Sequence, residues 1–183
     1  AVIVVRLDRS EFDAQIAKLR RPGPPLARAI NRSLASAQTL GARLVSRDMG
    51  LKVSVVKQFL KVRKSDANSL SATMYASAKR VPLIDFNAKG PDPSRGRGGG
   101  VRARMPGGAG RYPHAFITTV GRGRHRGVFT RKGIARLPIV ELHGPSIWQS
   151  YQTIKSEAHA RALEQLTKNV AHELAYALSR QAR

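Results

Sequence analysis

The residues of this sequence whose types and spacing could bind a partner are arginines set among glycines. They occur in two stretches, 95–100 (Arg-Gly-Arg-Gly-Gly-Gly) and 121–127 (Gly-Arg-Gly-Arg-His-Arg-Gly). A guanidinium group stays charged at neutral pH and forms paired hydrogen bonds with carboxylates and phosphates. We therefore expect these stretches, with the strand predicted just after the first, to contact a partner through Arg95, Arg97, Arg102, Arg104, Arg122, Arg124 and Arg126.

The residues that could catalyse a reaction or hold a metal are not spaced for it. The chain has no cysteine, which excludes disulfides, thiolate metal sites and cysteine nucleophiles. His172 and Glu173 lack a second histidine at position 176, so the helix motif of zinc proteases is absent. There is no Walker A loop, and Ser146 lacks the flanking glycines of a nucleophile elbow. We expect no catalytic, cofactor-binding or metal-binding residues, and we interpret most acids as helix caps or ion pairs.

The net charge of the chain is strongly positive. Thirty-three lysines and arginines face 11 acids, which gives +22, and twelve of the basic residues lie between Lys89 and Arg136 with one acid, Asp92. Charge of one sign opposes self-association until a partner neutralises it. Two interpretations remain open: the window binds nucleic acid, or it orders against an acidic neighbouring subunit. Aromatic residues make up only 5% of the chain and are absent from the Arg/Gly runs, which disfavours base stacking.

Helices are predicted on both sides of this window. Apolar residues recur every three or four positions from about 26 to 48, which predicts one long helix that ends near Gly50. A second long helix is predicted from about 155 to 178, with ion pairs 157–161 and 164–168 on its surface. Its expected apolar stripe is Leu163, Leu166, Val170, Leu174 and Ala177. Shorter helices are expected to begin at Ser10 and Ser54, which suit N-caps, and at Pro145, which suits a first turn.

Strands are predicted between the helices. The candidates are 2–7, 70–78, 81–86, 101–104, 114–120, 127–131 and 136–142. Together the elements predict an α+β fold, in which the long N-terminal-half helix and the C-terminal helix pack on a mainly antiparallel β-sheet with basic glycine-rich loops. We expect a single domain over 1–183, with mobile basic segments at about 87–111 and 121–127. No apolar run approaches the ~18 residues that span a bilayer, so we expect a soluble, unexported chain without membrane contact.

Several short segments occur in the order typical of one protein family, over roughly residues 25 to 150. They are Ala29-Ile30-Asn31-Arg32, Val81-Pro82-Leu83 with Phe86, Ala115-Phe116-Ile117, Val128-Phe129-Thr130-Arg131, Leu137-Pro138-Ile139 and Gly144-Pro145-Ser146. With these segments the chain resembles the minor tail protein Z family of tailed phages and prophages, the tail-completion proteins of lambda-like siphophages.

The resemblance implies a structural virion protein, not an enzyme, that acts at the head-proximal end of the tail and makes it competent for head–tail joining. The implied partners are tail terminator, tail tube and head–tail connector subunits, within a ring of six copies or, as the alternative, twelve. The implied location is the tail and neck of the virion, and the host cytoplasm during assembly. Contact of the basic segments with DNA in the channel is left open. The alternative function is a sequence-nonspecific nucleic-acid-binding protein.

Overall fold

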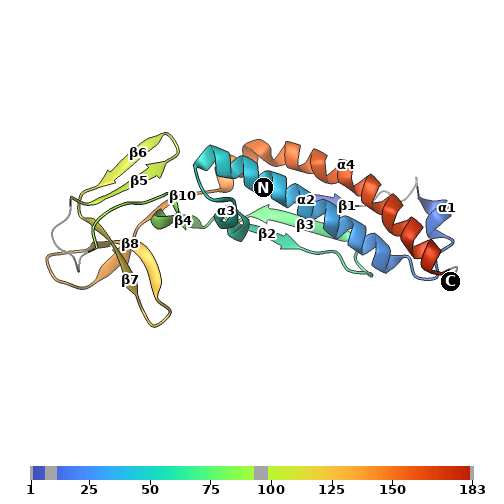
Figure 1. Ribbon diagram of the computed structural model, residues 1–183, viewed down its shortest axis with the longest axis horizontal. Helices are drawn as coiled ribbons and strands as arrows, with labels where there is room; N and C mark the ends of the chain where they lie inside the picture. Colours follow the sequence, from blue (N-terminus) through green and yellow to red (C-terminus); the bar gives the residue numbers. More distant parts are fainter. Residues whose placement is uncertain (1, 7–11, 93–98, 182–183) are drawn as a thin grey trace. The chain divides into compact units, whose positions relative to one another are not determined.

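The structure is a computed structural model that describes residues 2–6, 12–92 and 99–181. It has the predicted α+β class, with helices and antiparallel strands (Figure 1). The chain divides into two compact units. The helical unit comprises 1–44, 57–77 and 148–183, and the strand unit comprises 45–56 and 78–147. The expected single domain over 1–183, with its mobile segments, stays a prediction.

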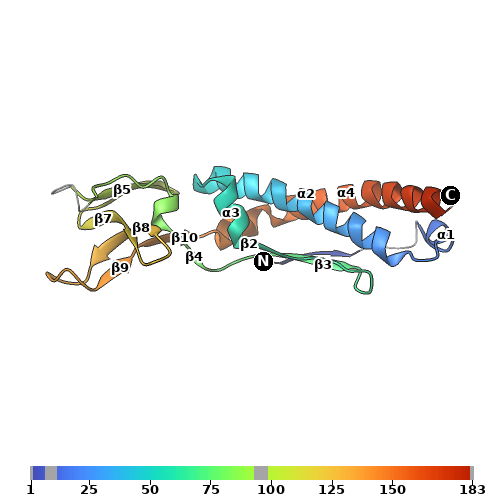
Figure 2. The same cartoon turned by 60° about the horizontal axis from the view of Figure 1, so that its bottom comes forward.

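The helical unit is a three-stranded antiparallel sheet covered on one face by two helices. The strands β1 (Val2–Arg6), β3 (Ser71–Ala76) and β2 (Leu60–Arg63) lie in the order β1-β3-β2. Alternation along β1 and β3 turns Ile3, Val5, Ala72, Met74 and Ala76 to the buried face. Figure 2 shows α2 (Gly23–Met49) and α4 (Trp148–Gln181) on one side of this sheet.

The long helix α2 follows the predicted apolar stripe over most of its length. On this stripe, Ile30, Leu34 and Ala37 are buried, whereas Leu40 and Leu44 are only partly buried. Gly41 faces α4, and a Cβ built on it would stand 3.5 Å from the Ile154 side chain, so a small residue allows the two helices to pack closely.

Two polar links fasten α2 to its neighbours in the helical unit. The Arg28 Nε donates to Glu173 Oε2 at 2.8 Å, and Arg32 pairs with Glu173 Oε1 at 2.7 Å. Asn31 donates from Nδ2 to the Ser65 carbonyl at 2.9 Å and accepts from the Ser65 amide at 2.8 Å. The polar residues beside the apolar stripe therefore hold α4 and the loop that follows β2.

The strand unit contains three small antiparallel sheets. A hairpin joins β5 (Val101–Met105) to β6 (Gly108–Tyr112), and β7 (Ala115–Val120), β8 (His125–Arg131) and β9 (Ile139–Glu141) form a meander. The third sheet pairs β4 (Arg80–Pro82) with β10 (His143–Ser146), and a 3₁₀ turn, η1 (Leu83–Asp85), follows β4. The Phe86 ring is fully buried, and Gly144 passes so close beneath it that a Cβ there would overlap the ring.

Several predicted helix starts are wrong. Pro145 and Ser146 lie in β10, where Ser146 pairs with Arg80, and α4 begins only at Trp148, because the chain first completes a strand pair. Ser54 lies inside α3 (Val53–Phe59), not at its N-cap, and α3 runs directly into the unpredicted strand β2. The expected cap Ser10 is outside the described residues, and the short α1 (Asp13–Ile16) follows Phe12 without a side-chain cap.

The outer surface of α4 also differs in detail from the prediction. Leu163 is exposed, while Ala162 takes the buried position beside Leu166, because the helix turns a face of small residues towards its neighbours. Arg161 pairs with Glu164 at 2.8 Å and not with the residue four positions before it. The predicted pair between Glu164 and Lys168 is confirmed at 2.9 Å.

Candidate functional site

The hairpin β5–β6 lies in the basic window, and its first strand covers the predicted strand 101–104. Pro106 and Gly107 form its two-residue turn, where Gly107 has a φ of 88°, a conformation that glycine adopts without strain. The inward side chains Val101 and Ala103 are buried. Alternation therefore leaves the other face of β5 to Arg102 and Arg104, which are exposed.

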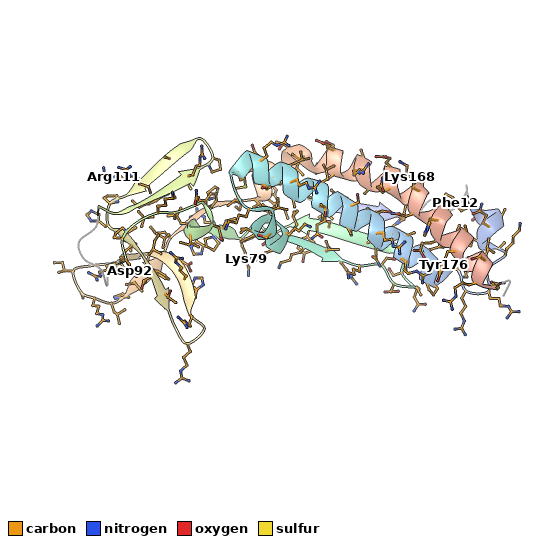
Figure 3. The ribbon with its side chains drawn as sticks, in the orientation of Figure 1. Phe12, Lys79, Asp92, Arg111, Lys168 and Tyr176 are labelled. Atoms are coloured by element: carbon orange, nitrogen blue, oxygen red, sulfur yellow. The ribbon has the colours of Figure 1, made fainter. Side chains whose placement is uncertain are left out.

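Four cations lie together on that face. Arg102 is directly opposite Arg111 of β6 on one side, and directly opposite Lys89 on the other, where Lys89 and Arg102 exchange two backbone hydrogen bonds of 2.8 Å. Residues paired in this way project from the same face with Cβ atoms roughly 5 Å apart. Arg104 is two positions along β5 and shares the face. We name this set, Lys89, Arg102, Arg104 and Arg111, the arginine face; Figure 3 labels Arg111 on its hairpin.

In the part of the chain that the structure describes, the arginine face forms no salt bridge. Within residues 2–6, 12–92 and 99–181, all the ion pairs involve other side chains, and none joins a carboxylate to these four cations. Like charges directly opposite each other on a sheet are destabilising. An external anion that approached this face would relieve that repulsion and form charge-assisted hydrogen bonds.

The family of the protein is decided by a comparison that covers nearly the whole chain. The family model described as prophage minor tail protein Z matches residues 16–183. The chain belongs to this family. No curated protein and no solved structure gives a significant match. The minor tail protein Z family is one of structural phage tail proteins, so the chain is a component of the virion tail.

The segments on which the resemblance depended meet in the folded chain. Phe116 of β7 is directly opposite Phe129 of β8, and Ile139 of β9 is opposite Arg131 of β8. Gly144 packs under Phe86, which brings two more of those segments together. In this minor tail protein, Phe86, Phe116 and Phe129 of these segments are therefore core or pairing residues of the strand unit, whereas the segment 29–32 lies in α2 of the helical unit.

The structure brings together only part of the contact set that the sequence predicted. Arg102 and Arg104 lie on the arginine face, whereas Arg122 and Arg124 lie in the turn of the β7–β8 hairpin and Arg126 in β8. Arg124 has a φ of 49° in that turn. Arg95 and Arg97 are outside the described residues.

Sequence reasoning missed Lys89 and Arg111. The signal was available in residues 106–107, because a Pro-Gly pair between two short alternating runs favours a two-residue turn. If residues 106 and 107 form the turn, pairing the strands outward from Met105 and Gly108 places Arg111 opposite Arg102. Lys89 could not be found in this way, since it joins the sheet through a single bridge and not through a strand.

Asp85 is an acid of the strand unit whose pKa is shifted and which borders a pocket. Burial raises the pKa of Asp85 above its usual range, and the Lys52 charge only partly opposes this effect. Asp85 shares a pocket with Asn87, Ala88 and Arg126, and no histidine lines it among the described residues. His125 Nε2 lies 2.8 Å from Glu141 Oε1. In the described part of the chain, no three His, Asp or Glu residues are grouped to hold a metal, and no helix is long and apolar enough to cross a membrane.

Proposed function

We propose that this minor tail protein is a tail-completion protein that acts at the head-proximal end of the tail and makes it competent for head–tail joining. It works structurally, without catalysis, in a ring of six or twelve copies in the neck region. Its partners are tail terminator, tail tube and head–tail connector subunits. Assembly takes place in the host cytoplasm. Membership of the minor tail protein Z family supports this role.

The main support for a docking mechanism comes from the arginine face. Its four exposed cations form no salt bridge with a carboxylate among the described residues, so no ion pair in that part of the chain offsets their repulsion. A neighbouring subunit that presents carboxylates would stabilise the assembled state and not the free one. Like charge on every copy also opposes premature self-association at a formal net charge of +22.

The experiment is complementation of a phage from which this gene is deleted. A variant with Lys89→Ser, Arg102→Ser, Arg104→Ser and Arg111→Ser is compared with a control that removes three exposed cations of the helical unit, Lys18→Ser, Lys155→Ser and Arg180→Ser. Truncating one member of a desolvated charge pair costs about 2 kcal/mol or more of binding. The arginine-face variant should yield tails that do not join heads, and the control should yield normal particles. Normal particles from both would contradict the proposal.

The rival function, sequence-nonspecific nucleic-acid binding, predicts a different result. Cations that contact phosphates release counterions, so affinity falls steeply with salt, by a log–log slope of about −0.9 for each phosphate neutralised on duplex DNA. The purified chain is titrated with random duplex and single-stranded DNA at several salt concentrations. Tight binding with a steep slope, together with no affinity for tails that lack this protein, would favour the rival.

A further inference from the structure

The sheet of the helical unit has a second face, opposite α2 and α4, that the proposed function does not use (Figure 2). Val2, Val4 and Tyr75 project from this face and are 58%, 45% and 44% exposed. Val2 is directly opposite Tyr75 across the β1–β3 pair, and Val4 is the next residue on the same face of β1. The three side chains thus form one continuous apolar surface and not scattered exposed residues.

The other side of the same face is cationic. Lys61 of β2 is directly opposite Tyr75, and Arg63 is directly opposite Thr73. Arg6 at the end of β1 is opposite Ser71. We name the six exposed residues Val2, Val4, Tyr75, Lys61, Arg63 and Arg6 the outer sheet face. Two of its rows run from a valine on β1, through β3, to a cation on β2, and Arg6 adds a third cation at the end of β1.

The described acid that follows β2 already accepts hydrogen bonds from the backbone. Asp66, on the turn between β2 and β3, accepts hydrogen bonds of 2.8 Å from the backbone amides of Asn68 and Ser69. Lys61, Arg63 and Arg6 form no ion pair among the described residues. The Ser69 and Asn68 amides, and then the Arg63 charge, lower the pKa of Asp66, so Arg63 already acts on one carboxylate. The face therefore offers apolar area beside cations that form no salt bridge in the described part of the chain, and its complement is an apolar surface beside carboxylates.

We infer that the outer sheet face is a second docking surface, and that it binds a different protein of the virion through apolar side chains next to Asp or Glu. A second copy of this chain that pairs through the same face does not fit, because it would bring the same three cations and no carboxylate. Nucleic acid does not fit either, because the patch beside the cations offers two valines and one aromatic ring. This surface lies in the helical unit, so it is independent of the arginine face in the strand unit.

Photocross-linking in assembled tails identifies what covers this face. Tyr75→p-benzoylphenylalanine keeps an aromatic ring at the position, and the same change at Tyr176, which is 51% exposed on α4, is the matched control. We expect a Tyr75 cross-link to a different virion protein, mapped by mass spectrometry to a peptide with Asp or Glu among apolar residues. A cross-link to a second copy or to DNA, or no cross-link above that of Tyr176, would overturn the inference.

A binding measurement tests the energetics with the full chain. The probe is purified tails from the phage lacking this gene, to which the purified protein is added and co-sedimented. Val4→Thr with Tyr75→Thr keeps residues that suit strands, and Leu163→Gln with Tyr176→Gln removes apolar groups of similar exposure from α4. The sheet variant should bind about tenfold more weakly, while the helix variant binds like the original chain. Equal binding by both variants would contradict the inference.

The two docking surfaces can fail separately. The variant of the arginine face should keep the Tyr75 cross-link if it still associates with tails through the outer sheet face. If the chain carrying the cross-linker at Tyr75 completes tails but gives no cross-link there, the inference of a second docking surface is wrong. The proposed function is unaffected by that result.

Discussion

The buried carboxylate of Glu173 is the residue with the clearest structural role. It is only 3% exposed and accepts from two half-exposed arginines of α2, Arg28 and Arg32. Hydrogen bonds to charged groups contribute more than neutral ones, although the partial exposure of the arginines reduces the loss. Glu173→Gln should lower the free energy of unfolding by about 1–2 kcal/mol, measured by urea denaturation.

The matched control is Glu164→Gln. Glu164 also contacts two cations, Arg161 and Lys168, but it lies on the exposed surface of α4. Exposed ion pairs contribute little, so this variant should change stability by less than about 1 kcal/mol. Equal effects of the two changes would show that burial of Glu173 does not matter.

Tyr151 has a buried hydroxyl without a hydrogen-bond partner among the described residues. An unsatisfied buried hydroxyl costs about 1–3 kcal/mol, so Tyr151→Phe should raise the free energy of unfolding by about 1 kcal/mol. Tyr176→Phe, on the exposed surface of α4, should leave it unchanged. A destabilised Tyr151→Phe variant would mean that the hydroxyl has a bonding partner.

The same residue predicts a pH effect. Burial raises the pKa of Tyr151 from 10.0 to about 12. Between these values the folded chain keeps the phenolic proton while the unfolded chain releases it, so stability falls as pH rises from about 10 to about 12. The fall should be smaller in Tyr151→Phe, measured by urea midpoints across this range. Parallel pH profiles would contradict the assignment.

The sequence shows which residues of α2 lie outside its apolar stripe, but not which residues of the rest of the chain they bind. Arg28 and Arg32 fall outside the apolar stripe, which is visible in the sequence. Their shared target, Glu173, lies far along the chain on another helix, and no local spacing points to it. Asn31 also lies beside the stripe, and its partner, the backbone of Ser65 just beyond β2, is likewise distant in the sequence.

At the scale of elements, the β4–β10 pair depends on one glycine. A Cβ at Gly144 would overlap the fully buried ring of Phe86, which has no space to withdraw into. Gly144→Ala should therefore destabilise the strand unit by about 1–3 kcal/mol, the cost typical of overpacking. Gly123→Ala is the control, since nothing lies within 4 Å of its Cβ position. Protection of amide hydrogens in β4 and β10 against exchange reports the effect, and unchanged protection would contradict it.

Elements with a clear period were predicted, and short or glycine-rich ones were missed. The alternation over 71–76 identified β3, and the three-to-four spacing identified α2. The strand β2 has four residues and follows α3 without a turn, so no change of period marks it. The strand β6 consists mostly of Gly and Ala, residues that are depleted in strands, and it forms because β5 and a Pro-Gly turn precede it.

At the scale of the whole molecule, two separate surfaces carry clusters of exposed cations. The net charge of +22 and the basic window were plain from the sequence, but which cations share a surface depends on strand register. The arginine face combines two predicted contact residues with Lys89 and Arg111, and the outer sheet face adds cations from outside the window. Both faces leave cations without partners among the described residues, as a subunit stabilised by assembly would.

Head–tail joining in vitro tests the central proposal most directly. Tails from a phage lacking this gene are mixed with purified DNA-filled heads, and joined particles are counted by electron microscopy before and after purified protein is added. The account predicts that the original chain and the Lys18/Lys155/Arg180 control restore joining, and that the arginine-face variant does not. The account is contradicted if tails from the phage lacking this gene join heads without added protein. It is also contradicted if the original chain, the control and the arginine-face variant restore joining equally.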